Sequence, residues 1–387
     1  MTTPTTRSSP ALLAIMATAL VLAVLEVACF GVVRVLIAKD AIYQPAELRD
    51  VEHYPRIRDP RLGWPSPLAY GSNALDSSGA RVLPAYPEPG RACVSTYGDS
   101  FVFGDEVDDA AAWTNQLALD LGCRVANYGV NGYGTDQAFL RMQGAPAEES
   151  RYTVLGVFTY DIVRNVNQLR NLLAPIHEIG LKPRYVIDAE DAMQLIALPS
   201  FDGAQLEDLI RHPERYLHDD YFVPGGPAGV VHARFPYTLT LLRALSSYKL
   251  AAVLRGRSPY AEFYDAGHPS QALAITARLC RMFEAEAAAR GKAPLVVMFP
   301  SRQDLEQFVE HGTWTYQPLM DRIAGGGRAP LNLGPLLLDA LGERKPEALF
   351  KLLHYNEEGN RVVAAAVAQA LRALPGPGFP RAADQPP

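Results

Sequence analysis

The strongest hydrophobic pattern of the chain lies near its beginning. Residues 11–33, ALLAIMATALVLAVLEVACFGVV, contain one charged residue, Glu26. A run of about 20 apolar residues is long enough to cross the roughly 30 Å hydrocarbon layer of a membrane. A secretory signal peptide has a shorter apolar core, about 7 to 15 residues, and ends in a small-residue cleavage site. We therefore expect an uncleaved transmembrane anchor over 11–38, preceded by an N-terminal tail over 1–10.

Glu26 is unusual within an apolar span. A central acid costs roughly 3 kcal/mol on insertion scales, and the many Leu, Ile, Val and Phe residues around it outweigh that cost. An acid at this depth by default marks a function or a partner. We expect either a membrane partner near Glu26 or a carboxyl that reaches toward one face of the bilayer. Charge counting leaves the orientation open, because the amino terminus and Arg7 balance Arg34 and Lys39.

After the span, the pattern changes twice. Residues 39–91 are rich in Pro, Gly, Asp and Tyr and show neither a helical nor an alternating period, so we interpret them as an irregular lead-in that packs on a domain. From Ala92 onward, short apolar runs alternate with amphipathic segments. We expect strands at 92–98, 124–130, 152–158 and 294–300, and helices at 110–122, 135–146, 271–291, 301–310 and 357–374.

This alternation predicts one α/β domain over 92–374. Strands that alternate with helices form a parallel sheet covered on both faces, and the run YTVLGVF at 152–158 is too apolar for an exposed strand. The period is lost over 166–269, which we interpret as a long insertion of helices and loops. A short apolar stretch near 331–338 helps to complete the sheet architecture, and the tail 375–387 is expected to be disordered.

Composition and charge exclude several classes of function. The 387 residues carry a net charge of -6 and no basic patch, so nucleic acid is not an expected partner. The four cysteines lack the spacing of a zinc or redox motif. Cys93 and Cys123 begin two strands that could be neighbours, and we expect buried free thiols there in preference to a bridge. His218, Asp219 and Asp220 form a lone HDD segment, which is more typical of a polar loop than of converging metal ligands, so we predict no metal and no cofactor.

Polar and glycine-rich segments follow three of the predicted strands. YGDSFVFG follows the first, NYGVNGYGTDQ the second and FTYDIVRN the third. In an open parallel sheet, ligands bind outside the carboxyl ends of the strands. We expect Ser100 at a strand-to-helix turn with its hydroxyl facing this crevice. Gly132 would let a backbone amide approach a developing oxyanion.

A serine hydroxyl becomes a good nucleophile only when a neighbouring base takes its proton. His354, in KLLHYNEEGN, precedes the final predicted helix and can return to the same edge of the sheet. His268, in YDAGHPSQAL, opens a different helix. We prefer His354 as the base, with His268 as the alternative and the absence of a catalytic histidine as the remaining hypothesis.

The segments YGDSFVFG, NYGVNGYGTDQ and HYNEEGN, in this order, resemble the SGNH/GDSL hydrolases. The likeness is greatest to membrane-anchored, envelope-facing members, some of them linked to exopolysaccharide acylation, and it extends over about 59–373. It implies a three-layer α/β/α sandwich with a parallel flavodoxin-like sheet. It also implies that Ser100 is the nucleophile, that His354 is the base, and that the amides of Ser100 and Gly132 form an oxyanion hole.

Two positions depart from the family pattern. Tyr160 stands where the family has an oxyanion-hole Asn, and Lys351 stands where it has the catalytic Asp. Replacing the orienting acid of a serine triad by a neutral amide costs about 10⁴ in turnover, and losing one oxyanion donor costs roughly 10² to 10³. Tyr160 or Asn131 could replace the missing donor. The candidates for the missing acid are Asp105, Glu343 and Glu347.

The resemblance implies a serine esterase or O-acyltransferase that acts through an acyl-enzyme on an acyl ester, above all an acetyl ester, of a carbohydrate or exopolysaccharide. We expect a single-pass protein of the inner membrane, held in the bilayer by residues 11–38, with its catalytic domain in the periplasm or outside the cell. The alternative is a catalytically degenerate SGNH-fold subunit that binds or assembles polysaccharide at the membrane. Lys351 and Tyr160 favour this alternative, whereas the intact Ser100 and His354 favour the enzyme.

Overall fold

The structure, a computed structural model, describes residues 9–39, 41–45, 54–67, 75–145, 150–174, 176–375 and 379. Its main sheet has five parallel strands in the order β2-β1-β3-β6-β7. Numbered within the sheet, this is the 2-1-3-4-5 order of flavodoxin-like folds. The strands are β1 (Val94–Tyr97), β2 (Val125–Asn127), β3 (Tyr152–Phe158), β6 (Ala293–Phe299) and β7 (Leu331–Asn332).

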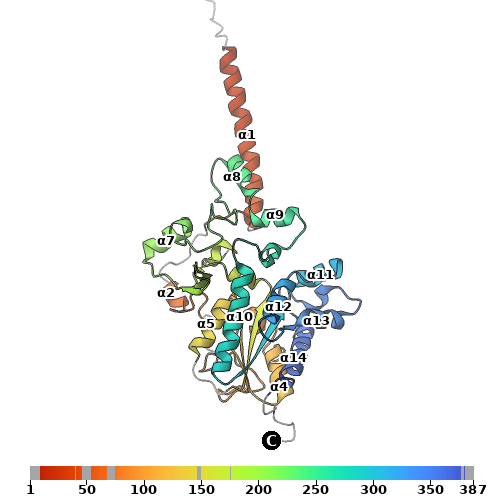
Figure 1. Cartoon of the computed structure of the whole chain (residues 1–387). Coiled ribbons are helices and arrows are strands. Elements are labelled where there is room, and N and C mark those ends of the chain that lie inside the picture. Colours follow the sequence, from red (N-terminus) through yellow and green to blue (C-terminus); the bar gives the residue numbers. More distant parts are fainter. Residues whose placement is uncertain are drawn as a thin grey trace, which may run out of the picture.

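The centre of the sheet is formed by β3 and β6. They pair along their whole length, from Tyr152 opposite Ala293 to Phe158 opposite Phe299. Nearly all residues of β3 are buried, as expected for a parallel strand with helices on both faces. Helices α5 (Thr135–Gly144), α10 (Ala272–Ala289) and α12 (Gln317–Ala324) pack together over one face, and α4 (Trp113–Leu121), α13 (Leu333–Leu341) and α14 (Glu357–Arg372) over the other (Figure 1). The predicted three-layer α/β/α sandwich is confirmed.

The apolar stretch 331–338 contributes less strand than its composition indicates. Only Leu331 and Asn332 join the sheet, and α13 begins at the next residue. The change occurs because the Asn332 side chain accepts a hydrogen bond from the Gly334 amide at 2.9 Å and thereby caps the helix. The remaining short elements of the sandwich are α3 (Ser100–Phe103), α6 (Asp161–Arg164), α11 (Arg302–His311) and η5 (Pro346–Leu349).

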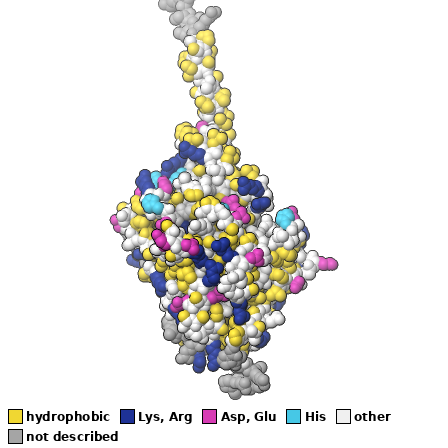
Figure 2. Space-filling model, in the orientation of Figure 1, with side chains coloured by type: hydrophobic (Ala, Val, Ile, Leu, Met, Phe, Trp, Pro, Cys, Tyr) yellow, Lys and Arg dark blue, Asp and Glu magenta, His cyan; other side chains and the backbone are white. Residues whose placement is uncertain are grey.

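Helix α1 (Pro10–Ala38) has 29 residues and projects away from the sandwich (Figure 1). At a rise of about 1.5 Å per residue it is roughly 43 Å long. Among the described residues it is the one helix long and apolar enough to cross a membrane, although a signal sequence would meet the same test. Apolar side chains cover it and continue onto the body at its base (Figure 2).

The insertion 166–269 lies largely between α1 and the sandwich (Figure 1). Besides helices and loops it contains an antiparallel hairpin that the sequence did not predict, because each strand has only four residues and shows no clear period. Its elements are η2 (Arg170–Leu172), β4 (Arg184–Ile187), β5 (Met193–Ile196), α7 (Gly203–Arg211), η3 (Pro213–Arg215), α8 (Tyr237–Ala244), α9 (Tyr248–Leu254) and η4 (Ala261–Tyr264).

The described parts of 39–91 contain a single short helix, α2 (Tyr54–Ile57), and lie against the domain. The Trp64 amide donates a hydrogen bond to the Leu181 carbonyl at 2.9 Å, and the Arg81 amide donates to the Asn127 carbonyl at 2.8 Å. Arg81 thereby pairs with the end of the edge strand β2. Most of the tail 375–387 and of the first ten residues lies outside the described residues, so the predictions for them stay untested.

Cys93 and Cys123 form a disulfide, with their Cα atoms 6.0 Å apart. The expectation of free thiols is therefore wrong. Each cysteine lies just before its strand, and β1 and β2 are parallel neighbours with Val94 opposite Val125, which places the two thiols within bridging distance. A disulfide persists in oxidising compartments and is rare in the cytosol.

Replacing both Cys93 and Cys123 with alanine is expected to lower the free energy of unfolding by about 3 to 4 kcal/mol, because the bridge closes a loop with a sequence separation of 30. Urea unfolding of the full chain in detergent measures this loss. Dithiothreitol should produce the same loss in the wild type and none in the double variant. A double variant as stable as the wild type would contradict the prediction.

Candidate active site

Ser100 is the first residue of α3, directly after β1 and its turn. The preceding residue, Asp99, caps this one-turn helix by accepting a hydrogen bond from the Phe101 amide at 2.9 Å. The turn is tight at Gly98, where a Cβ would lie 2.3 Å from Cγ2 of Val102. The GDS segment is therefore a compact strand-turn-helix unit that holds Ser100 at the carboxyl end of the sheet.

His354 lies directly opposite this serine. Its Nε2 is 2.8 Å from Oγ of Ser100. The histidine occupies a turn flanked by Phe350 and Tyr355, which pair as an isolated antiparallel bridge just before α14. Its ring packs on Phe101 with the ring centroids 4.9 Å apart, and its side chain is 14% exposed. The structure thus brings the nucleophile and the base expected from the sequence into hydrogen-bond contact.

Glu106 supplies a carboxylate that the sequence reasoning missed. Its Oε1 is 2.9 Å from Nδ1 of His354, the nitrogen that faces away from Ser100. The same carboxylate accepts hydrogen bonds from the backbone amides of Leu352 at 2.8 Å, Leu353 at 3.0 Å and His354 at 3.2 Å. Ser100, His354 and Glu106 therefore form the geometry of a serine triad, with the acid after the serine in the sequence rather than just before the histidine.

The surroundings of Glu106 keep it ionised. Burial raises the pKa of its carboxyl, but the hydrogen bonds from His354 and from the three backbone amides outweigh burial and lower the pKa to about 2. An ionised carboxylate next to Nδ1 favours the tautomer in which this nitrogen carries the proton. Nε2 of His354 is then left to accept the proton of Ser100.

The acids proposed from the sequence do not contact His354 in the described part of the chain. Asp105, next to Glu106, instead accepts a hydrogen bond from Nδ2 of Asn131 at 2.6 Å. The pKa of the Asp105 carboxyl is raised, and burial is the main cause. The two more distant candidates, Glu343 and Glu347, have exposed side chains. The carboxylate next to His354 thus belongs to Glu106 and not to any of these acids.

Lys351, at the family's acid position, has an exposed side chain. Its backbone amide donates a hydrogen bond to the carbonyl of His354 at 3.0 Å and closes the turn that presents the imidazole. Gly104 ends α3 with φ +84°, so the glycine in the sequence was a signal for a reversal of the chain there, but not for which acid would reach His354. Glu106 itself has φ +70°, which no sequence pattern indicates for a glutamate.

The turn that carries Glu106 is held in place by Arg81, a residue of the lead-in 39–91. Arg81 is 6% exposed, and its guanidinium donates hydrogen bonds to the carbonyls of Phe103 and, at 2.9 Å, Gly104. The same guanidinium donates to the Asp109 carboxylate at 2.6 Å from Nη2. These bonds span both ends of the segment 103–109, so Arg81 acts as a positioning residue for Glu106.

The expected oxyanion-hole amides belong to Ser100 and Gly132. Neither amide has a hydrogen-bond partner among the described residues. Gly132 has φ +80° in a turn that the Tyr133 amide closes onto the Val130 carbonyl at 3.1 Å, a conformation that favours glycine. Gly132 does not itself line the cavity beside Ser100, whereas its neighbour Asn131 does.

This cavity has a volume of about 650 Å³. Tyr160, at the position where the resemblance implies an Asn, lies in its wall next to Tyr260 of the insertion, with the two ring centroids 5.7 Å apart. Leu352 and Leu353 form part of its rim, and Leu353 is 75% exposed. A space of this size, lined by aromatic, apolar and a few polar groups, is suited to a small-molecule or sugar ligand. The insertion thus contributes directly to the site.

A buried ion cluster connects the loops below the cavity. Nη1 of Arg164 donates to Asp99 at 2.8 Å, to Asp161 at 2.9 Å and to the Tyr133 carbonyl at 2.9 Å. Burial, together with the neighbouring Asp99, raises the pKa of Asp161 well above its usual range. Because these groups follow β1, β2 and β3, the cluster fixes the relative positions of the three loops that carry the site.

His268, the alternative base, lies at the end of the insertion. Its Nδ1 is 2.7 Å from Oγ of Ser270, and its ring packs on Phe263 with centroids 4.5 Å apart. These contacts give it a structural role. Asp220, from the HDD segment, is likewise structural, because it is buried and accepts hydrogen bonds from the Gln168 and Leu169 amides at 2.6 and 2.9 Å.

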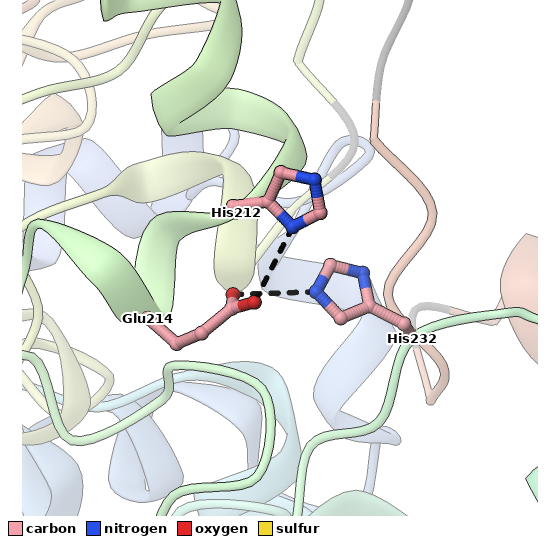
Figure 3. Close-up of side chains that lie close together, drawn as sticks. All are labelled: His212, Glu214 and His232. Atoms are coloured by element: carbon pink, nitrogen blue, oxygen red, sulfur yellow. Dashed lines mark hydrogen bonds and ion pairs between the residues drawn. The ribbon is translucent and has the colours of Figure 1, made fainter.

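Another group of possible metal ligands lies in the insertion. The ligand atoms of His212, Glu214 and His232 fall within 4.8 Å of one another (Figure 3). Glu214 lies 3.4 Å from Nδ1 of His212 and 3.3 Å from Nε2 of His232. Nη2 of Arg234 also lies 3.4 Å from Nδ1 of His212. A guanidinium beside that nitrogen opposes a second cation, so the residue types fit a metal but their electrostatic setting does not.

Comparison with known proteins finds no matching family model and no matching curated protein. Several solved structures are similar over most of their length. A protein described as lipolytic and of the G-D-S-L family, from Desulfitobacterium hafniense DCB-2, has 12% identity and a TM-score of 0.36, with 71% of this chain and 97% of that chain covered. TesA has 12% identity and a TM-score of 0.35, with 72% and 97% covered. AlinE4, an SGNH-hydrolase family esterase, has 13% identity and a TM-score of 0.30, with 74% and 99% covered.

These identities are below 25% and the TM-scores below 0.5, so they carry no weight for function. A chemical role for this site rests on the geometry of Ser100, His354 and Glu106.

Proposed function

We propose that this protein is a serine esterase or O-acyltransferase of the SGNH/GDSL type. The observation that carries the proposal is the contact chain from Ser100 Oγ to His354 Nε2 and from His354 Nδ1 to Glu106, at 2.8 and 2.9 Å, on the wall of the cavity. A hydroxyl, an imidazole and an ionised carboxylate in this order perform acyl transfer in unrelated folds, because their roles depend on geometry and not on sequence position.

In the first half of the reaction, Ser100 Oγ attacks the acyl carbonyl carbon while Nε2 of His354 takes the hydroxyl proton. The carboxylate of Glu106 stabilises the imidazolium that forms. The amides of Ser100 and Gly132 are the proposed donors to the oxyanion. Collapse of this intermediate breaks the ester bond, and the leaving alcohol receives the proton from His354, which leaves an acyl-serine.

In the second half, water or a sugar hydroxyl gives its proton to His354 and attacks the acyl-serine. The bond from the acyl carbon to Oγ of Ser100 then breaks, and His354 returns the proton to Ser100. Water completes hydrolysis, and a sugar hydroxyl completes transfer, through the same intermediate. The proposed substrate is an acyl ester, above all an acetyl ester, of a carbohydrate or exopolysaccharide. The aromatic rings of Tyr160 and Tyr260 in the cavity wall and the likeness of the sequence to envelope-facing members of the family support this choice.

The rival function, a degenerate subunit that only binds polysaccharide, rested on Lys351 and Tyr160. Glu106 removes the first of these supports, because the base has its carboxylate. We therefore favour the enzyme. Release of p-nitrophenol from p-nitrophenyl acetate by the full chain in detergent is the first test, and mass analysis of an added oligosaccharide reports acetyl transfer. A folded protein that shows neither hydrolysis nor transfer would overturn the proposal.

We also infer that α1 remains attached as a single-pass anchor of the inner membrane, with the sandwich in the periplasm or outside the cell. The carboxylate of Glu26 accepts hydrogen bonds from the amides of Tyr237 at 2.6 Å and Thr238 at 3.3 Å, at the first turn of α8. The acid of the apolar span thus has its partner within the same chain. A negative charge at a helix N-terminus is favourable.

Further contacts tie the last turns of α1 to the body of the protein. Val33 is fully buried and packs with Ile42 and Ala244 in a second, smaller core. Removal of α1 as a signal peptide would expose this core and leave the first turn of α8 without its cap. Leu242 of α8 and Leu245, which directly follows the helix, are 65% and 61% exposed, which suits a helix beside the membrane surface.

The anchor predicts that the mature chain keeps α1. After expression in a bacterial host, the protein should stay with the membranes during an alkaline carbonate wash, and its intact mass should include residues 10–38. A matched chain that begins after residue 38 should enter the soluble fraction. A mature wild-type chain that lacks Glu26 and is recovered as a soluble protein would contradict the inference.

A further inference from the structure

One of the three arginines that line the cavity beside Ser100 is Arg170. It belongs to η2, at the start of the insertion. Its backbone is fixed, since its amide donates a hydrogen bond to the Gly180 carbonyl at 2.8 Å. The two backbone segments, at Arg170 and at Gly180, approach so closely that a Cβ on Gly180 would lie 2.4 Å from Cβ of Arg170. The fold therefore holds this arginine in the cavity wall.

Nη1 of Arg170 is buried and has no hydrogen-bond partner in the described part of the chain. A buried cation is costly unless a counter-charge and hydrogen bonds compensate it. Arg164, by contrast, has two carboxylate partners, Asp99 and Asp161. Burial and the nearby charge of Arg164 lower the pKa of Arg170 to about 10, so it is still positively charged at neutral pH.

The cavity offers no free acid to this cation. Glu306 is the one carboxylate among the described residues of the cavity wall, and it lies 3.3 Å from Nε of Arg302 at the rim. Arg302 is thus paired at the rim, and Arg164 is paired with two buried carboxylates, so the lining is positive at Arg170. A positive, partly enclosed pocket attracts anions and strengthens their hydrogen bonds to arginine.

We propose that Arg170 binds an anionic group, a carboxylate or a phosphate, on the carbohydrate substrate. The planar guanidinium suits both groups, and either would give the Arg170 cation, which lines the cavity, the counter-charge that it lacks. The inference rests on the proposed function for the role of the bound molecule, and it adds the substrate class: the ester to be cleaved or formed lies on a sugar that also bears a negative charge. The insertion then selects the substrate, and Ser100 performs the chemistry.

The test begins with ligand binding by the full chain in detergent, measured by titration calorimetry with glucose, glucuronate, glucose 6-phosphate and inorganic phosphate. The wild type should bind at least one anionic sugar at least about tenfold more tightly than glucose. The tighter of glucuronate and glucose 6-phosphate identifies the group. Arg170→Gln should remove the preference, whereas Arg211→Gln, the same change at a 68% exposed arginine of α7, should keep it.

Equal binding of glucose and of both anionic sugars by the wild type would overturn the proposal, and this comparison needs no variant. A preference that survives in Arg170→Gln would overturn it as well. If that variant does not fold by circular dichroism, Arg170→Lys replaces it, and the anionic sugar should then bind more weakly because the guanidinium fork is lost.

The catalytic arm compares kcat/KM for acetylated glucuronate, or acetylated glucose 6-phosphate, with that for acetylated glucose. The anionic ester should be favoured at least about tenfold in the wild type and lose this advantage in Arg170→Gln. An active enzyme without the preference would overturn the anion site alone. A protein inactive on every ester that still binds an anionic sugar through Arg170 would overturn the proposed esterase and support the anion site.

Discussion

Replacing Ser100 with alanine is expected to lower kcat for p-nitrophenyl acetate by about 10⁶. The alanine variant has no nucleophile to form the acyl-enzyme, and the base His354 has no hydroxyl to activate at 2.8 Å. His354→Ala should cause a loss of similar size, since the residues of a serine triad act as a unit. Initial rates of p-nitrophenol release by the full chain in detergent measure both losses.

The control for this prediction is Ser246→Ala, the same substitution at an exposed serine of the insertion. This variant should keep the wild-type rate. A Ser100→Ala protein that is folded and retains more than about a hundredth of the wild-type rate would contradict the assignment and place the nucleophile elsewhere.

Replacing Glu106 with glutamine is expected to lower kcat by about 10⁴. The amide can still hold the loop 352–354, but it no longer selects the tautomer of His354 in which Nε2 accepts the serine proton. It also removes the charge that stabilises the imidazolium. Since the pKa of Glu106 is about 2, the wild-type carboxylate is ionised at every pH of the assay, and its own titration should not appear in the wild-type rate between pH 6 and pH 9.

Glu343→Gln is the matched control, because it is the same change at an exposed acid that the sequence had suggested for this role. It should retain the wild-type rate. A loss of less than about tenfold in Glu106→Gln would show that the 2.9 Å contact with Nδ1 has no catalytic importance. In that case a dyad of Ser100 and His354 would be the better description.

The sheet was the part of the fold most accessible to sequence reasoning. The strand expected at 152–158 is β3 with the same bounds, and the strand expected at 294–300 is β6 shifted by one residue. These strands are buried on both faces, so their composition alone distinguishes them. The order of the sheet then follows from the resemblance, and the carboxyl ends of the strands locate the site.

The acid and the disulfide could not be predicted in the same way. The position of Glu106 depends on its left-handed backbone conformation, and on a reversal of the chain after α3, while the family pattern directs attention to the residue three before His354. The bridge between Cys93 and Cys123 depends on the pairing of β1 with β2. Both features come from contacts between segments that lie apart in the sequence or turn back on themselves.

The insertion was the least predictable region. Its sequence has no strong period, and nothing in it indicates that Arg170 and Tyr260 reach the cavity beside Ser100. The contact of Glu26 with the first turn of α8 is similar, because an acid in an apolar span indicates that a partner exists but not which segment provides it. These contacts are known only once the chain is folded.

The central claim is that Ser100 is a nucleophile activated by His354 and Glu106, and covalent labelling tests it most directly. A fluorophosphonate should react with the full chain as Oγ of Ser100 displaces fluoride, and mass analysis of the peptide that contains Ser100 reads the adduct. We predict one adduct on Ser100 in the wild type, much slower labelling in Glu106→Gln and none in His354→Ala. An unlabelled Ser100 in the folded wild type, or labelling at the same rate in all three proteins, would contradict the account.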